Sequence, residues 1–121
     1  MAVEPTHILV VDDDAEICDL LREYLIDLDF DVSVAIDAAH GREILNTREI
    51  NLLISDQIMF GELGLQLADF AGSLGVPTIL MSGDPKSYES LPGQKHAFIQ
   101  KPFHLEDLAK LLHRVLACHT V

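Results

Sequence analysis

The 121-residue chain has no tryptophan, only two cysteines, and eight lysines and arginines against twenty aspartates and glutamates. Cys18 and Cys118 are too few and too far apart in sequence for a disulfide framework. Both fall in helical patterns, so we expect them to be small residues in or near the core. The net charge of −12 opposes the polyanionic backbone of nucleic acids. Direct nucleic-acid binding is therefore not expected.

Long apolar runs are missing as well. No stretch approaches the length of a membrane span, and residues 1–7 lack the basic start and apolar run of a signal peptide. We therefore expect a cytoplasmic protein with no membrane partner. The six histidines show no HExxH or Cys/His ligand spacing, which argues against a histidine metal site.

Short apolar runs alternate with helical patterns along the whole chain. Strands are expected at 8–11, 32–36, 52–54, 78–81 and 97–99, and helices at 14–28, 38–45, 63–70 and 104–118. Residues 85–95 contain Pro92-Gly93 and should hold two helical turns at most. This alternation predicts one α/β domain over residues 5–121, with a doubly wound, five-stranded parallel sheet and helices on both faces.

Chemically active residues follow four of the predicted strands at their carboxyl ends. Asp12, Asp13 and Asp14 follow the first strand, Asp56 the third, Ser82 the fourth and Lys101 the fifth. Each has an ordinary explanation by itself: Asp14 as a helix N-cap, Ser82 as a turn residue, Lys101 as a solvated charge. Because open parallel sheets bind ligands at this edge, their coincidence predicts a functional site there.

The carboxylates of this group should repel one another. Two unit charges ~4 Å apart repel by about 4 kcal/mol at an effective dielectric near 20, so either a pKa rises or a divalent cation binds. A few oxygen ligands with room for water favour Mg²⁺, for which Mn²⁺ can substitute. With the cation present, Asp56 can act as a nucleophile toward a phosphoryl group whose oxygens Ser82 and Lys101 hold. The residues indicate a phosphoryl-accepting carboxylate.

Four segments resemble, in order, the signature segments of response-regulator receiver domains. They are Ile8-Leu-Val-Val-Asp-Asp-Asp14, Leu53-Ile-Ser-Asp-Gln-Ile-Met59 with Gly64 further on, Leu80-Met-Ser-Gly83 and Gln100-Lys-Pro-Phe103. The resemblance implies a flavodoxin-like (βα)5 fold with strand order 2-1-3-4-5. It also implies a signalling domain in a two-component system or phosphorelay. Such a domain takes a phosphoryl group from a histidine kinase or phosphotransfer protein and then changes the surface that it offers to a downstream partner or attached domain. It promotes its own phosphorylation and dephosphorylation, and the resemblance implies a signalling domain and not an enzyme.

The same resemblance implies roles for individual residues around the cation. Asp56 would be the phosphoacceptor, and Asp12 and Asp13 the acidic pair at the Mg²⁺ site. Asp13, Asp56 and the main-chain carbonyl of Ile58 would ligate the ion directly.

Further roles implied by the resemblance concern the later strands. Ser82 would be the switch hydroxyl, Lys101 the phosphate-sensing amine, and Phe98 either the switch aromatic or a plain core residue. The resemblance also makes the Lys101–Pro102 bond a candidate for a cis peptide bond, since only X–Pro bonds form this isomer readily.

Departures from the family pattern surround the phosphoacceptor. Phe60 replaces a usual proline and Leu63 a common acid, which should reshape the loop. Ile58 stands where polar side chains can position a hydrolytic water, so we expect slow self-dephosphorylation, with Asp84 as a second residue that tunes it. The short stretch between Ser82 and Lys101 implies a shortened fourth helix, as in stand-alone receivers and those of hybrid kinases.

Three other readings compete with this one. A haloacid-dehalogenase-like phosphatase would use Asp12 as its nucleophile. Against this reading, Glu16 stands where the motif of such phosphatases has Thr or Val, and no acidic pair follows Lys101. This reading would also leave Asp56 without a role. A receiver-like module that binds partners without phosphate is a second alternative, disfavoured by the complete set of site residues. A flavodoxin-type FMN carrier would need a Ser/Thr/Gly-rich loop after the first strand and an aromatic such as tryptophan to flank the flavin.

Overall fold

Strands and helices alternate as the sequence predicts. The computed structural model describes residues 5–59, 62–85 and 95–119. The elements are β1 (His7–Val11), α1 (Ala15–Asp27), β2 (Asp31–Ala35), α2 (Ala38–Thr47), β3 (Leu52–Asp56), β4 (Ile58–Met59), β5 (Glu62–Leu63), α3 (Gly64–Ser73), β6 (Thr78–Ser82), β7 (Ala97–Gln100) and α5 (Leu105–His119). The two short strands β4 and β5 are not expected from the sequence. Most of the segment in which a short fourth helix is predicted, together with Phe60, lies outside the described residues.

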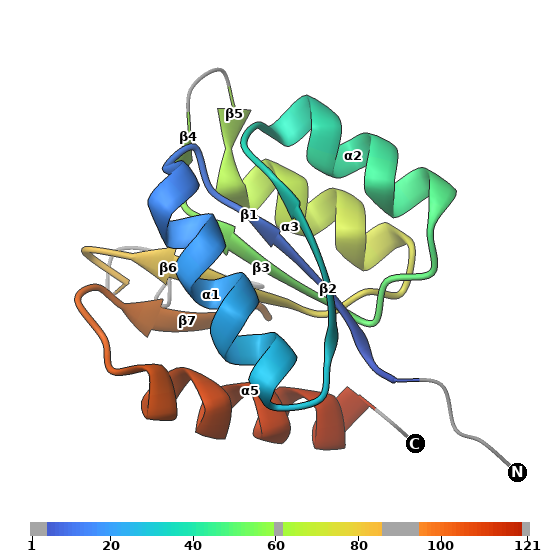
Figure 1. Ribbon diagram of the computed structural model, residues 1–121. Helices are drawn as coiled ribbons and strands as arrows, with labels where there is room; N and C mark the ends of the chain where they lie inside the picture. The colour runs from blue at the N-terminus through green and yellow to red at the C-terminus, as the bar shows by residue number, and fades with distance from the viewer. Residues whose placement is uncertain (1–4, 60–61, 86–94, 120–121) are drawn as a thin grey trace, which may run out of the picture.

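Five parallel strands form the main sheet in the order β2-β1-β3-β6-β7. Counted along the chain, these are strands 2-1-3-4-5, so the predicted doubly wound, flavodoxin-like fold is confirmed. Helices α1 and α5 cover one face, and α2 and α3 cover the other (Figure 1). The order reverses between β1 and β3, which places the carboxyl ends of these two strands side by side.

The continuous apolar run of β1 is explained by burial on both faces of the sheet. Ile8 and Val10 pack in the core beneath α1 and α5, whereas Leu9 and Val11 pack beneath α2 and α3. Successive side chains of a strand point to opposite faces, so a central strand of a sheet covered on both sides must be apolar throughout. Strand β1 is thereby packed on both faces up to the point where the polar residues Asp12 and Asp13 follow it.

Aspartates begin two of the helices. The side chain of Asp14 accepts a hydrogen bond from Glu16 N–H at 3.0 Å, which confirms the predicted N-cap of α1. Asp37 accepts from His40 N–H at 2.7 Å and caps α2. Helix α3 extends through Gly72 and ends at Ser73, and Gly75 then adopts the left-handed conformation with φ +80°. Helix α1 therefore begins directly after the acidic residues that follow β1.

One cysteine prediction is wrong. Cys18 is buried, as expected, but Cys118 is exposed. The buried stripe of α5 runs through Leu108 and Leu112, and at about 3.6 residues per turn a residue six positions beyond Leu112 lies off that stripe. Within the part of the chain that the structure describes, no helix is long and apolar enough to span a membrane.

Candidate functional site at the carboxyl edge of the sheet

Three carboxylates converge where β1 and β3 end. Asp12 and Asp13 follow β1, Asp56 is the last residue of β3, and one oxygen of each lies within 4.8 Å of the others. The register of the sheet causes this convergence, because Val11 pairs with Ser55. The sheet thus brings together the acids that the sequence predicted as a group.

Asp12 is the buried member of this cluster. Its side chain is 1% exposed, Oδ1 accepts a hydrogen bond from Asp14 N–H at 2.9 Å, and Oδ2 has no hydrogen-bond partner. Burial raises the pKa of Asp12 to about 6, against the opposing effect of the Asp14 hydrogen bond, and the charge of Asp56 adds to the rise. A buried carboxylate oxygen without a donor is an energetic defect unless another group satisfies it.

Asp56 and Lys101 form the central ion pair. Lys101 Nζ donates to Asp56 Oδ1 at 2.8 Å and lies 3.8 Å from Asp12 Oδ2. Gln57 N–H donates to the same Asp56 oxygen at 3.0 Å. The Lys101–Pro102 peptide bond is cis. Three carboxylates and one ammonium leave the cluster with an excess of negative charge when all the acids are ionised, which favours a bound cation.

Ser82 and Asp84 lie next to this pair at the end of β6. Ser82 is 4% exposed, and its Oγ accepts a hydrogen bond from Asp84 N–H at 3.0 Å. Its main-chain oxygen accepts from Lys101 N–H at 2.8 Å, which ties β6 to the start of the loop that carries the lysine. The hydroxyl and the ammonium group therefore sit on strand ends that are hydrogen-bonded to each other.

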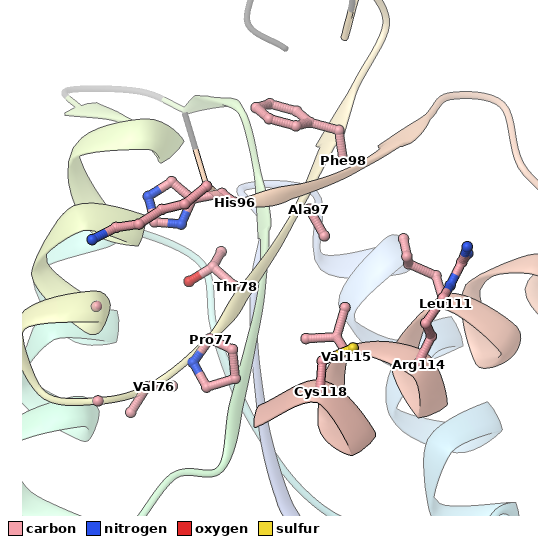
Figure 2. A pocket seen from close by; sticks show the side chains of 13 residues that line it. Val76, Pro77, Thr78, His96, Ala97, Phe98, Leu111, Arg114, Val115 and Cys118 are labelled. Atoms are coloured by element: carbon pink, nitrogen blue, oxygen red, sulfur yellow. The ribbon is translucent and has the colours of Figure 1, made fainter. Parts of the chain in front are cut away.

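Phe98 occupies a different part of the molecule. It lies in β7 opposite Leu80, is half-buried, and points to the other side of the strand from Ala97 (Figure 2). Its ring borders a groove of about 820 Å³ between α3 and α5 at the amino end of β6, lined also by Thr78, His96 and Val115. None of the described residues that line this groove carries a carboxylate. The groove is thus separate from the cluster of Asp12, Asp13 and Asp56.

A small antiparallel hairpin follows Asp56, which sequence reasoning missed. Ile58 in β4 pairs with Leu63 in β5, and Gly64 N–H donates to Gln57 O at 2.7 Å. Hydrogen-bonded and non-hydrogen-bonded pairs alternate along an antiparallel ladder. Since Gln57 and Gly64 form a bonded pair, Ile58 and Leu63 form a non-bonded one. The main-chain carbonyl of Ile58 is therefore directed away from the hairpin partner and remains available as a ligand.

Gly64 permits the close approach of α3 to the end of β3. A Cβ at this position would lie 2.2 Å from Asp56 O and 2.9 Å from Gln57 Cα. Both are backbone atoms, so no side-chain movement can relieve the contact. The absence of a side chain at Gly64 thus lets the start of α3 pack against the backbone of the phosphoacceptor candidate Asp56 and of Gln57.

The family model of the response regulator receiver domain matches residues 8–113. Protein PetR of Rhodobacter capsulatus is 34% identical over 120 residues, covering 96% of this chain and 51% of PetR. The probable transcriptional regulator ycf29 of Cyanophora paradoxa is 30% identical, covering 95% of this chain and 58% of that protein. The chain spans little more than half the length of these two relatives.

Solved receiver structures superpose on nearly the whole chain. The CheY-like receiver domain protein of Methanospirillum hungatei JF-1 matches with a TM-score of 0.86 and 27% identity, covering 96% of this chain and 97% of that one. The receiver domain of hybrid histidine kinase CckA matches with a TM-score of 0.76 and 29% identity, covering 91% and 98%. Together with the fold and the acidic cluster, these matches show that the chain belongs to the response regulator receiver domain family of two-component signalling.

Proposed function

We propose that this receiver accepts a phosphoryl group on Asp56 from a histidine kinase or a phosphotransfer protein. Phosphorylation on aspartate is typical of the family. The observation that carries the assignment is the position of Asp56 beside the buried carboxylate of Asp12, one oxygen of which has no hydrogen-bond partner, and 2.8 Å from the Lys101 ammonium. At 14% side-chain exposure, Asp56 is more accessible than Asp12. This difference supports Asp56 over Asp12 as the nucleophile and so disfavours the phosphatase alternative.

The residues present fit a divalent cation. Receiver domains bind Mg²⁺ at their acidic site, and here Asp13, Asp56 and the Ile58 carbonyl would hold it, with Asp12 beside them. All the donors are oxygens, and Asp13 is exposed, which leaves room for coordinated water. Mn²⁺ prefers similar ligands and should substitute. When bound, the ion supplies positive charge that offsets the repulsion between the carboxylates and the phosphoryl oxygens.

Lys101 and Ser82 complete the proposed site. The Lys101 ammonium, which now donates to Asp56, would donate to a phosphoryl oxygen once Asp56 carries the group. The Ser82 oxygen accepts from Asp84 N–H, so its own hydroxyl proton is left to donate to a second phosphoryl oxygen. Movement of Ser82 toward that group would open space for Phe98 to turn inward, which changes the surface that a downstream partner binds.

Intact-protein mass spectrometry after incubation with acetyl phosphate and MgCl₂ tests the phosphoacceptor. Wild type should gain one labile phosphoryl adduct, and Asp56→Asn should gain none. Asp27→Asn, the same change at an exposed aspartate at the far end of α1, should behave like wild type. Addition of EDTA before the phosphodonor should abolish the wild-type adduct.

Three results would overturn this assignment. An adduct on both wild type and Asp56→Asn would place the phosphoryl group on another residue. No adduct on either would support a module that binds its partner without phosphate. Steady hydrolysis of p-nitrophenyl phosphate that is lost in Asp12→Asn and kept in Asp56→Asn would instead establish the phosphatase alternative.

A further inference from the structure

Asp12 is held at three points by neighbouring groups. Its main-chain N–H donates to Ala35 O at 3.1 Å, and its side-chain Oδ1 accepts from Asp14 N–H at 2.9 Å. Its main-chain oxygen accepts from the thiol of Cys18, with Sγ 3.3 Å away. These contacts leave Oδ2 without a hydrogen-bond partner, 3.8 Å from Lys101 Nζ. The direction of Oδ2 at the edge of the cation site is therefore set by the three contacts together.

Cys18 is placed to act on the ends of two strands at once. It lies in α1, is 2% exposed, and its sulfur is 3.3 Å from the oxygen of Asp12 and 3.8 Å from that of Ala35. Asp12 and Ala35 are the residues at which the chain leaves the ladder between β1 and β2. The Cys18 sulfur is therefore within hydrogen-bond distance of the main chain at both strand ends.

We propose that Cys18 is a positioning residue for the cation site, whose S–H group holds the main chain of Asp12 and so aims Oδ2 toward the metal. This inference rests on the proposed function, because it requires that Asp12 helps to hold Mg²⁺. Among the residues that the structure describes, the thiol is the group that donates to this buried carbonyl. Without that donor the carbonyl would be left unsatisfied in the interior, and the peptide would tilt to find another partner. Oδ2 would then move with it.

Replacements at position 18 separate donation from packing. Cys18→Ser keeps a donor, Cys18→Val fills the space without a donor, and Cys18→Ala removes both. The binding of MgCl₂ alone would be followed in ¹H–¹⁵N NMR spectra through the amide signals of residues 12–14 and 56–58. Loss of partners that orient metal ligands typically weakens metal binding 10- to 100-fold, and a thiol is a weak donor. We therefore expect roughly 3- to 10-fold weaker Mg²⁺ binding in the valine and alanine variants, and binding within about twofold of wild type in the serine variant.

The spectra recorded before Mg²⁺ is added provide a second readout. The amide signal of Asp14, whose N–H bonds to Asp12 Oδ1, should shift in Cys18→Val and Cys18→Ala and return toward the wild-type position in Cys18→Ser. Cys118→Ala removes the exposed thiol at the other end of the molecule and should change neither the Asp14 signal nor Mg²⁺ affinity. Thermal unfolding in EDTA would establish that each variant is folded. If the alanine variant is not, the serine and valine variants decide the question.

The outcomes distinguish this inference from the proposed function. Equal Mg²⁺ affinity in wild type and all three variants would overturn the role of Cys18 and leave phosphorylation of Asp56 untouched. Wild-type affinity in Cys18→Val with weaker binding in Cys18→Ser would show that packing, not donation, matters, and would also overturn it. Failure of wild type to bind Mg²⁺ would instead contradict the proposed function itself.

Discussion

Both ends of the parallel sheet carry buried or half-buried polar side chains. The hydrogen bonding and the charge balance of these side chains differ between the two ends. At the amino end, Ser33 Oγ lies 2.7 Å from His7 Nε2 and accepts from Arg48 at 3.1 Å. His96 Nε2 pairs with Asp69 at 2.8 Å. These contacts match donors with acceptors across neighbouring elements. They explain the polar residues there as supports of the fold.

At the carboxyl end, acids outnumber the cation. The described cluster holds three carboxylates, those of Asp12, Asp13 and Asp56, and one ammonium group, that of Lys101, which pairs with Asp12 and Asp56. One buried oxygen of Asp12 has no hydrogen-bond partner. The amino end has its own unpartnered atom, the buried hydroxyl of Thr78, but that group is neutral and its burial costs far less than that of a charge. The groove of about 820 Å³ also lies at the amino end. An imbalance of charge therefore marks the functional end of this sheet.

Substitution of Gly64 should disturb the carboxyl end most strongly. Gly64→Ala places a Cβ against backbone atoms of Asp56 and Gln57, so we expect a loss of at least about 3 kcal/mol in the free energy of unfolding, measured with urea. Gly72→Ala is the matched control within the same helix, because its Cβ would meet only His96 Cε1 at 4.0 Å. If both variants are as stable as wild type, the close approach of α3 to β3 is not a constraint.

The buried charge of Asp12 should make stability depend on pH. Its pKa is raised from 3.8 to about 6, so the folded state binds this proton more tightly than the unfolded state. The resulting stabilisation is fully present below about pH 4 and is lost as pH rises through 6. A shift of this size corresponds to about 3 kcal/mol. In EDTA, wild type should lose up to that amount relative to Asp12→Asn between pH 4 and pH 7.

The comparison with Asp12→Asn isolates this effect from that of the other carboxylates. Urea unfolding at several pH values would measure it, and Mg²⁺ at pH 7 should restore part of the lost stability in wild type. Asp31→Asn changes an exposed aspartate at the amino end and should give a profile parallel to that of wild type. A parallel profile for Asp12→Asn as well would contradict the burial argument.

The side chain of Ile58 should set the lifetime of the phosphorylated state. It is 71% exposed on the hairpin that follows Asp56 and offers no hydrogen bond to an attacking water. Ile58→Asn should therefore speed loss of the phosphoryl group about fivefold, the equivalent of one hydrogen bond worth about 1 kcal/mol. Mass spectrometry of the decay after removal of acetyl phosphate would measure this. Leu63→Asn, at the paired position, should leave the rate unchanged, and an unchanged rate in Ile58→Asn would refute the prediction.

The smallest effect is expected at the amino end. Asp69→Asn removes the charge of the carboxylate that faces His96, and because Asp69 is 69% exposed we expect a loss of about 1 kcal/mol or less in unfolding free energy. Phosphorylation and Mg²⁺ affinity should match wild type. A change in either of them would show that the two ends of the sheet are energetically coupled.

Much of the fold could be predicted from the sequence because its signals are local. The apolar run of residues 8–11 and the cap at Asp14 each depend on a few neighbouring residues, and both predictions are confirmed. The hairpin of β4 and β5 was missed because strands of two residues are too short to show an alternation. The exposure of Cys118 was missed because a position in a helix does not by itself imply burial, and Cys118 lies off the buried stripe through Leu108 and Leu112.

Sequence alone determined which residue types follow each strand, since strand ends are set by local apolar patterns. The acids, the hydroxyl and the lysine could be assigned to one edge before any coordinates. Only the tertiary structure decided how these charges are balanced. Burial of Asp12 beneath α1, the approach of Lys101 to Asp56 and the thiol of Cys18 against a strand end all join residues distant along the chain or on separate elements. Desolvation and hydrogen bonding depend on such neighbours in space, and a pattern along the chain does not contain them.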